Sequence, residues 1–433
     1  MNKATDNNRQ LAIFGGEKTI KKDFASYRSI GDEEEKAAIE VIKSGVLSKF
    51  LGCWHDDFYG GPKVREFEKC AAEFFKVKYA ITVNSLTSGL IAAVGAIGIE
   101  PGDEVIVTPW TMSATATAIL HWNGIPVFAD IDRDTYNLCP SSIQDRISHK
   151  TKAIIVADIF GQSADMDEIM SIAHKHNLKV ISDTAQAPGA KYKSNHAGTC
   201  ADIGGYSLNY HKHIHTGEGG ILVTNDDNLA EKLYLIRNHG EVVVGDKGTK
   251  DISNILGYNF RLGEIECAMG ITQLKKLNGI IKTRIQLAEQ LKKGLEKLEG
   301  LTMPLVKANR DHVYYVFPMQ VDLNHRGISK EKICKALNTE GVGVSAHYQN
   351  IHLLPLYQQK IAYGKKGFPW VKGICEREIS YAKGICPIAE SLNDKYYLGF
   401  PMCAYDLKQN EVNLIIEAFH KVWHNLDKLQ ESI

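Results

Sequence analysis

Two periods of apolar residues alternate along the chain between residues 32 and 225. Residues 32–44 show the helical period, and we expect Asp32 to cap this helix and Gly45 to end it. Pro62 favours the start of a second helix, because proline suits the first helical turn. Alternation of helical and strand patterns predicts a largely parallel sheet between two layers of helices. The runs typical of strands are 80–83, 104–108, 126–129, 153–158, 179–183, 203–208 and 220–224.

The pattern changes after residue 263. From 263 to 299 the helical period continues through residues rich in Lys, Glu, Gln and Leu, which predicts one or two long amphipathic helices. A strand-like run at 314–321, a helix after Ser329 and a final helix from Leu407 follow, in the mixed order of a small α+β domain. We predict an N-terminal arm over residues 1–30, a large domain over 31–275, and a linking helix with a smaller C-terminal domain over 276–433.

Length, charge and cysteine content limit the kinds of function. A chain of 433 residues is too long for one hydrophobic core, so we expect two or three domains. Lys plus Arg equals Asp plus Glu at 51 each, which gives no reason to expect a nucleic acid as a partner. Nine cysteines without a C-x-x-C pair favour free thiols in a reducing compartment. The sequence contains no run of 18 uncharged apolar residues, which a membrane span would require, and we therefore expect a cytoplasmic protein.

Three polar features fall at the carboxyl ends of predicted strands, where open α/β sheets bind ligands. The segment TVNSLTSG at 82–89 leaves a strand and enters an apolar helix, whose free N–H groups could face an anion. Asp183 ends the strand at 179–183 and is followed closely by Gln186. The run at 203–208 delivers Ser207 and then Lys212. Ordinary capping explains the first segment and Asp183 equally well, so neither alone identifies a site.

The three features together fit pyridoxal 5'-phosphate. The helix entry would hold the phosphate, Asp183 would face the pyridinium nitrogen, and Lys212 would form a Schiff base with the aldehyde. Each feature by itself is ambiguous. Their order and spacing along the chain indicate this cofactor.

Lys212 stands in the segment SLNYHKHIHTGEGG at 207–220, between His211, His213 and His215. On a strand these three imidazoles would share a face and could hold zinc. A zinc ion would crowd a lysine that must stay free, and no fourth-ligand spacing of Glu or Cys accompanies the histidines. We therefore expect no metal and place the histidines around the lysine loop. The GEGG run lacks the G-K-[ST] ending of a phosphate loop, so we expect a turn there.

Many spaced stretches carry a resemblance to a known family. They are GPKVREFE at 61–68, EPGDEVIV at 100–107, PVFADID at 126–132, FGQSADMD at 160–167, DTAQA at 183–187, GEGG at 217–220, RNHG at 237–240, GYNFR at 257–261 and HY at 347–348. Over almost its whole length the chain resembles the DegT/DnrJ/EryC1/StrS sugar aminotransferases. The resemblance implies an α/β fold of the fold type I pyridoxal-phosphate enzymes, with a mainly parallel sheet between helices in a large domain and a smaller C-terminal α+β domain.

The resemblance also implies roles for single residues. Lys212 looks like the lysine that binds the cofactor, and Asp183 like the partner of its ring nitrogen. These two would be the catalytic residues. Asn259 would reach the phosphate from the neighbouring subunit, so a homodimer would share its active sites. The cofactor-binding residues implied in this way are Leu86 and Thr87 through their backbone, Met112, Asp183, Gln186 at the ring hydroxyl, Ser207 at the phosphate, Lys212 and Asn259.

Some positions depart from the family pattern. Met112 stands where most relatives place an aromatic ring on the cofactor; a thioether can lie on a ring face, and Trp110 two residues earlier could help. Leu86 replaces a common small residue, and Asp158 stands where the family often has histidine. The chain also exceeds the usual family length, with additions near 241–256 and 356–381. These departures remove no catalytic group, but they affect the choice of substrate.

The activity that the resemblance implies is transfer of an amino group from glutamate or glutamine to a keto sugar linked to a nucleotide. Alternatives are a keto-cyclitol or keto-sugar phosphate as acceptor, or aminohydroxybenzoate formation. Sugar dehydration is disfavoured because those relatives generally carry histidine where this chain has Lys212. A non-catalytic regulator is disfavoured because Lys212 and Asp183 are both present.

Overall fold

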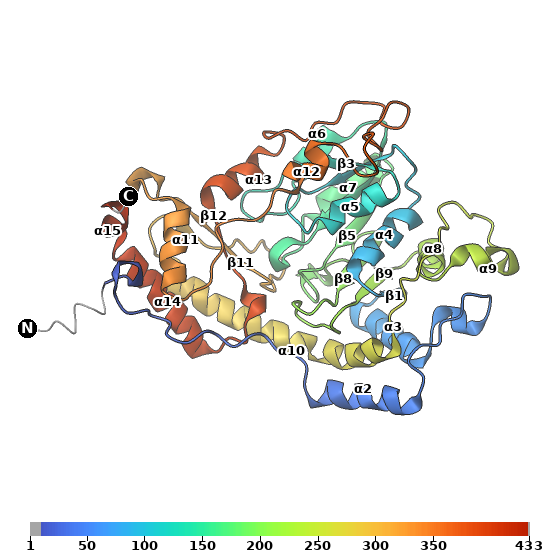
Figure 1. The fold of residues 1–433 in the computed structure, drawn as a ribbon, viewed down its shortest axis with the longest axis horizontal. Coiled ribbons are helices and arrows are strands. Elements are labelled where there is room, and N and C mark those ends of the chain that lie inside the picture. Colours follow the sequence, from blue (N-terminus) through green and yellow to red (C-terminus); the bar gives the residue numbers. More distant parts are fainter. Residues whose placement is uncertain (1–9, 432–433) are drawn as a thin grey trace, which may run out of the picture.

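A seven-stranded sheet forms the centre of the protein in a computed structural model that describes residues 10–431 (Figure 1). Residues 1–9 of the predicted arm and residues 432–433 of the predicted C-terminal domain lie outside this range. Four neighbouring pairs in the sheet are parallel, and only β9 runs against both of its neighbours. The order across the sheet is β1 (Tyr79–Val83), β9 (Gly220–Thr224), β8 (Ile203–Ser207), β5 (Lys179–Asp183), β4 (Thr151–Ala157), β2 (Glu104–Val107) and β3 (Ile125–Phe128).

Helices cover both faces of this sheet, because its strands are apolar on both sides. Leu222 of β9 faces α4, while Ile221 and Val223 on the opposite side join the core beneath α3 and α10. The expected α/β architecture with a mainly parallel sheet is confirmed. One layer comprises α4 (Leu86–Ala96), α5 (Ala114–His121) and α8 (Asp227–Arg237), and the other comprises α3 (Pro62–Phe75), α6 (Pro140–Arg146), α7 (Met166–Lys175) and α10 (Glu264–Leu295).

The apolar pattern over 263–299 forms one helix of 32 residues, α10, which runs beneath both parts of the molecule (Figure 1). Beyond it, a three-stranded antiparallel sheet packs with helices into a separate apolar cluster, as expected for a smaller α+β domain. This sheet contains β10 (Leu301–Thr302), β11 (Phe317–Val321) and β12 (Tyr397–Phe400), and its helices are α11 (Lys330–Thr339), α14 (Gln409–Trp423) and α15 (Leu426–Glu431). The division into 1–30, 31–275 and 276–433 stays a prediction.

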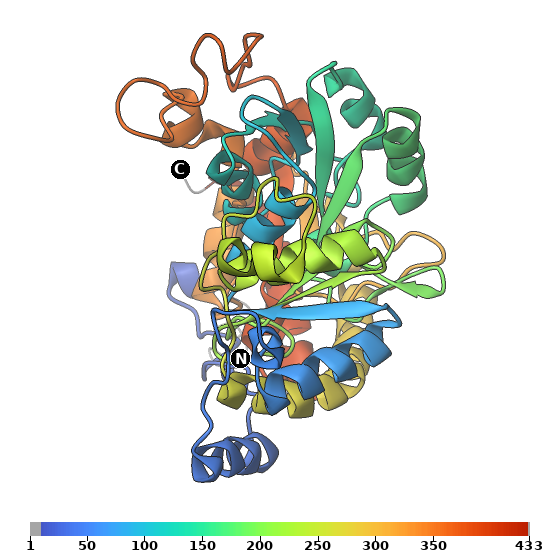
Figure 2. The same cartoon turned by 90° about the vertical axis from the view of Figure 1, so that its right-hand side faces the viewer.

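The described part of the N-terminal arm links the smaller domain to α2 (Asp32–Ser44), which stands out from the body of the molecule (Figures 1 and 2). Tyr27 N–H donates to Ala404 O, and Ile20 N–H donates to Glu340 O. Leu11 and Ile20 are buried in the apolar cluster of the smaller domain. The arm is therefore attached to the C-terminal part of the chain before it reaches α2.

Several element ends differ from the sequence predictions. Asp32 is the first helical residue of α2 and not its cap; Gly31 takes the cap position, and its N–H donates to the Glu34 carboxylate. Gly45 ends α2 with a left-handed backbone, as expected. The strand predicted from 314 begins only at Phe317, because Tyr314 has a positive φ of 50° that a strand cannot contain.

The remaining short elements occupy the edges of the larger sheet. The added segment near 356–381 packs over the open edge of β3, where Tyr381 Oη donates to Pro126 O at 2.8 Å and Arg377 binds both oxygens of Glu104 (Figure 2). Covering an edge strand in this way blocks pairing with other chains. No helix within residues 10–431 is both long and apolar enough to cross a membrane. The other short elements are β6 (Lys191–Tyr192), β7 (Asn195–His196), α9 (Gly240–Lys247), α12 (Pro355–Gln358) and α13 (Pro387–Ser391).

Candidate active site

The ends of three strands and the start of one helix meet at one edge of the larger sheet. Val83 at the end of β1 and Ser207 at the end of β8 both pair with Gly220. Asp183 at the end of β5 pairs with Gly205 of β8. The fold therefore brings the start of α4, Ser207 and Asp183 to neighbouring positions, with the loop that carries Lys212 directly after β8.

The first turn of α4 leaves two backbone N–H groups for a ligand. Ser85 Oγ accepts from Ser88 N–H at 3.1 Å, and this cap leaves the N–H groups of Leu86 and Thr87 without an acceptor in the described part of the chain. At Gly220, an added Cβ would lie 2.8 Å from the Leu86 nitrogen, so only glycine lets β9 approach the helix so closely. Such an N-terminus suits a phosphate.

Leu86 fits this turn because its side chain points into the core. The side chain is buried and lies against Gly205, where an added Cβ would come within 2.6 Å of Leu86 Cδ1. The Leu86 side chain thus fits because Gly205 of β8 has no side chain at this point. Its departure from the small residue common in the family leaves the backbone of the turn free to bind a ligand.

Asp183 is a buried carboxylate held by two donors. Thr115 Oγ1 donates to Asp183 Oδ2 at 2.7 Å, and Ala185 N–H donates to Oδ1 at 3.2 Å. Burial raises the pKa of Asp183, whereas these two bonds and the charge of Lys212 act to lower it. A buried carboxylate is stabilised by a cation, and a protonated pyridine nitrogen would supply one.

Thr115 was not identified from the sequence. It lies in α5, one turn after Thr111, and the hydroxyls of these two residues are 2.9 Å apart. The two threonines that follow a predicted strand were the signal in the sequence; in the structure Thr111 lies in the turn before α5 and Thr115 within the helix.

Lys212 is only 8% exposed although it lies in a loop. Its N–H donates to Asn209 O at 2.9 Å, and its Nζ lies 4.5 Å from the centre of the Tyr315 ring. Burial lowers the pKa of Lys212, while the negative charge of Asp183 and a contribution from Cys403 oppose this. A lysine with a lowered pKa is more often neutral, and a neutral amine is the nucleophile that an aldehyde requires.

Ser207 ends β8, and Gln186 lies three residues beyond the end of β5. Gln186 Oε1 accepts from Phe160 N–H at 2.8 Å, and its Nε2 donates to Tyr348 Oη at 3.3 Å. Burial raises the pKa of Tyr348 to about 12, so this phenol keeps its proton. Ser207 Oγ accepts from Asn209 N–H at 3.3 Å. The amide of Gln186 is thus held at both ends beside Asp183.

The structure separates Met112 from Trp110. Met112 is 67% exposed on the turn before α5, where it can lie against a bound ring. Trp110 is fully buried; its Nε1 donates to Asn350 Oδ1 at 2.7 Å, and its ring stacks on Tyr136. The suggestion that Trp110 helps to hold the cofactor is therefore wrong, because its ring packs inside the protein.

The main chain of Asn259 contacts Asn84, which lies just before the first turn of α4, the turn proposed to hold the phosphate (the phosphate cradle). Asn84 Nδ2 donates to Asn259 O at 3.2 Å, whereas Asn259 Oδ1 accepts from Arg261 Nε at 2.7 Å. The side chain of Asn259 is exposed. Asp158 lies beneath the strand ends and accepts bonds from Ser182 and Thr184, so it supports the segment around Asp183.

The three histidines near Lys212 do not share a face. His213 is buried, His215 is half-buried and His211 is exposed, because residues 208–216 form a loop and not a strand. In the portion of the chain from 10 to 431, no three His, Cys, Asp or Glu side chains gather as metal ligands. The metal hypothesis therefore has no geometric support among these residues.

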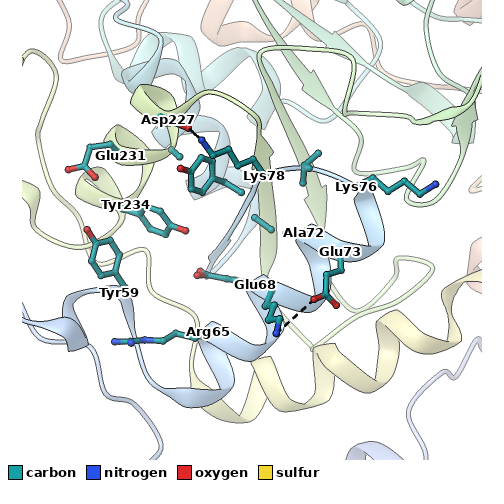
Figure 3. Close-up of a pocket in the computed structure, with 15 residues that line it drawn as sticks. Tyr59, Arg65, Glu68, Ala72, Glu73, Lys76, Lys78, Asp227, Glu231 and Tyr234 are labelled. Atoms are coloured by element: carbon teal, nitrogen blue, oxygen red, sulfur yellow. Dashed lines mark hydrogen bonds and ion pairs between the residues drawn. The ribbon is translucent and has the colours of Figure 1, made fainter.

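A separate cavity of about 900 Å³ lies between α3, β1 and α8 (Figure 3). Its charged side chains largely neutralise one another, for example Lys78 with Asp227 and Lys69 with Glu73. None of the residues predicted to bind the cofactor lines it. This cavity is distinct from the lysine site.

The groups at the strand ends match pyridoxal 5'-phosphate part by part. Free N–H groups of α4 suit the phosphate, buried Asp183 suits a protonated ring nitrogen, and the Gln186 amide suits the ring hydroxyl. Lys212 suits the aldehyde, because it is an amine with a lowered pKa. The residues present therefore fit this cofactor.

Comparison with known proteins identifies the family of this chain. The family model of the DegT/DnrJ/EryC1/StrS aminotransferase family matches residues 30–392. The spore coat polysaccharide biosynthesis protein SpsC of Bacillus subtilis is 34% identical over 372 residues, which are 84% of this chain and 92% of that protein. The GDP-perosamine synthase of Caulobacter vibrioides is 34% identical over 300 residues, which are 69% of this chain and 79% of that protein.

A solved structure, the aminotransferase from Psychrobacter cryohalolentis, superimposes with a TM-score of 0.81 at 29% identity, covering 93% of this chain and all of that one. This agreement extends over both the larger and the smaller domain, and it confirms the expected fold of the type I pyridoxal-phosphate enzymes. The chain thus belongs to the DegT/DnrJ/EryC1/StrS aminotransferase family and is a pyridoxal-phosphate-dependent aminotransferase.

Proposed function

We propose that this enzyme moves an amino group from glutamate or glutamine to a nucleotide-linked keto sugar, in the synthesis of an amino sugar. The observation that carries the proposal is the meeting of buried Lys212 and buried Asp183 beside the free N-terminus of α4. The two relatives support a carbohydrate acceptor, because one is a GDP-perosamine synthase and the other serves polysaccharide biosynthesis.

Different residues of the chain have different roles in the proposed reaction. When bound, pyridoxal 5'-phosphate supplies an electron sink for the carbanion at the α-carbon of the amino donor. Asp183 holds the proton on the ring nitrogen through its carboxylate, and Thr115 orients that carboxylate. Lys212 Nζ takes the proton from the donor's α-carbon and later returns one to the acceptor carbon, as general base and then general acid.

The binding residues keep the reacting groups in place. The N–H groups of Leu86 and Thr87 and the hydroxyl of Ser207 bind the phosphate, while Gln186 orients the ring hydroxyl. Met112 would pack its thioether against one face of the ring. Burial of Asp183 and Lys212 excludes water from their side of the ring, which strengthens the electrostatic interactions between the reacting groups.

The proposal includes a homodimer in which Asn259 of each chain serves the phosphate of the other. Two observations support this arrangement. The main chain of Asn259 is hydrogen-bonded to Asn84 beside the phosphate cradle, and the side chain of Asn259 is exposed. We place the enzyme in the cytoplasm, because all nine cysteines are unpaired and free thiols persist in reducing compartments.

Two half-reactions, measured separately, test the function. Glutamate or glutamine added to the cofactor-loaded protein should change the visible absorption and release the matching keto acid. A nucleotide-linked keto sugar should then restore the original absorption and yield an amino sugar, whereas Lys212→Ala should show neither change. Restoration by a keto-cyclitol or a keto-sugar phosphate alone would contradict the proposed acceptor.

A further inference from the structure

His213 follows Lys212 directly and is the one of the three neighbouring histidines whose side chain is fully buried. Its Nε2 lies 2.9 Å from Val313 O. Because a carbonyl only accepts, Nε2 carries the proton in this bond, and Nδ1 then faces the Cys403 thiol at 3.8 Å. Burial and the nearby charge of Arg284 hold the pKa of His213 well below its ordinary value, so the ring is neutral.

Further segments meet at the same residue. Tyr27 Oη, from the N-terminal arm, donates to the backbone carbonyl of His213 at 2.6 Å. Arg284 of α10 lies over the Tyr27 ring at 4.9 Å and donates to Cys403 Sγ at 2.8 Å. The arm, α10, the segment at 313 and the segment at 403 therefore all converge on the residue that follows the lysine.

The same contacts reach the side chain of Lys212. Tyr315, two residues after Val313, supplies the ring that lies 4.5 Å from Lys212 Nζ. Cys403 N–H donates to Tyr315 O at 3.1 Å, and Tyr315 N–H donates to Phe160 O at 2.9 Å. The His213 ring beside Lys212 and the aromatic ring against the lysine amine thus both belong to contacts with the segment 313–315.

The side chains of the other two histidines make no hydrogen bond to a distant segment within residues 10–431, although His215 N–H donates to Gln273 Oε1 of α10 at 3.2 Å. His215 Nδ1 accepts only from Gly217 N–H at 3.3 Å, within its own turn. His211 is exposed, and its ring lies 6.2 Å from Tyr315. Among the three histidines, His213 is the one whose side chain is hydrogen-bonded to the segment at 313 in the described structure.

We propose that His213 is a positioning residue, which holds Lys212 at the cofactor site by tying the lysine loop to Val313 through its ring and to Tyr27 through its backbone carbonyl. The inference rests on the proposed function, because that function assigns Lys212 as the lysine that binds the cofactor. It gives the histidine next to Lys212 a role that is separate from metal binding and from contact with substrate.

Three variants separate positioning from general stability. His213→Gln keeps an N–H near the place of Nε2, and His213→Phe keeps a ring but removes the donor. His215→Gln is the matched control, two residues further along the same loop. For each protein we would measure the melting temperature without cofactor, the rate at which added pyridoxal 5'-phosphate becomes attached, and the lysine that carries it after borohydride reduction.

His213→Phe should load the cofactor at least about tenfold more slowly than the parent, since one lost hydrogen bond to a buried carbonyl corresponds to roughly that factor. His213→Gln should recover most of the rate, and His215→Gln should load like the parent. A lower melting temperature with parental loading in His213→Phe would overturn the inference, because the histidine would then act on stability alone.

A second variant covers the case in which His213→Phe does not fold. Tyr27→Phe removes the donor to the His213 carbonyl without touching the core of the site, and it should also slow loading. Parental loading by Tyr27→Phe in that case would overturn the inference. Cofactor found on a lysine other than Lys212 would instead contradict the proposed function, so the two failures are distinguishable.

Discussion

Asp183 is a buried carboxyl whose charge few neighbouring groups stabilise. Thr115 and the Ala185 N–H are its two hydrogen-bond donors, and Lys212 is the cation whose charge acts on it. Since burial alone raises the pKa of this carboxyl, the site favours any ligand that brings a positive charge. This preference links the position of Asp183 at a strand end to the chemistry of a protonated ring nitrogen.

Replacing Asp183 by Asn should slow proton abstraction from the amino donor by roughly 10²–10⁴, the scale of single acid–base and electrostatic contributions. The variant keeps the shape of the side chain and one accepting oxygen but removes its charge. Single-turnover kinetics of the donor half-reaction would measure the effect. Thr115→Val should lower the rate by a smaller factor, because it leaves the charge in place. A near-parental rate for Asp183→Asn would show that another group protonates the ring.

For single residues, the spacing of motifs in the sequence was sufficient to locate some members of the candidate active site but not others. Asp183 and Ser207 end strands, and Gln186 and Lys212 follow them within a few residues, and strand ends can be recognised from apolar runs. Tyr315 could not be found in this way, because it reaches Lys212 from a distant part of the chain. Trp110 was misjudged because an aromatic residue near a site looks the same in sequence whether it is buried or exposed.

Among the elements, α2 is joined to α10 by a buried charge at Glu34, beside an exposed ion pair between Glu33 and Lys276. Glu34 is buried and accepts bonds from Lys276, Gln273 and Thr272 of α10 at 2.7, 2.9 and 2.7 Å. Burial alone would raise the pKa of Glu34, but these bonds outweigh it and lower the pKa to about 2. A carboxyl with a lowered pKa stabilises the fold above its unfolded pKa of about 4.3, and this contribution is lost as the pH falls from about 4 towards 2.

Glu34→Gln should therefore destabilise the protein at pH 7 by about 1.5–3 kcal/mol, the usual contribution of hydrogen bonds to a charged group. Glu35→Gln is the control, because Glu35 is an exposed acid on the same helix. Urea unfolding at pH 7 and at pH 3 would compare the variants. The difference between Glu34→Gln and the parent should shrink at the lower pH; an equal difference at both values would contradict the role of the charge.

The order of helices and strands could be predicted from the periodicity of apolar residues. The conformation of the loops could not. The strands at 179–183 and 220–224 begin and end where the apolar pattern predicts, and the helix at 32–44 ends where it predicts. The alternate histidines of 211–215 suggested a face, but Lys212 N–H turns back to Asn209 O and the segment forms a loop. Backbone turns of this kind depend on contacts with distant segments such as Tyr27 and Val313, which periodicity does not report.

For the molecule as a whole, many separately spaced stretches were enough to identify the family, because a fold shared over residues 30–392 leaves matches in every part of the chain. The assembly could not be predicted from single-chain patterns in the same way. A shared site depends on which exposed side chains face another copy, and the exposed Asn259 is the residue that our proposal places there.

Mixing two inactive variants tests the shared site. A heterodimer of an Asn259→Ala chain and a Lys212→Ala chain should contain one site with both defects and one with neither, so activity should return. This expectation holds when subunits exchange and Asn259→Ala alone is clearly impaired, which the loss of a charge-assisted bond of roughly 1.5–3 kcal/mol should ensure. If Asn259 served its own chain, each site would carry one defect and the mixture would stay inactive.

The attachment point of the cofactor tests the central claim most directly. Purified protein loaded with pyridoxal 5'-phosphate would be reduced with borohydride, digested and mapped by mass spectrometry. Our account predicts that the cofactor is fixed to the peptide that contains Lys212, and that Lys212→Ala remains folded, carries no fixed cofactor at that position and does not turn over. Cofactor fixed to a different lysine of the parent protein would contradict the account.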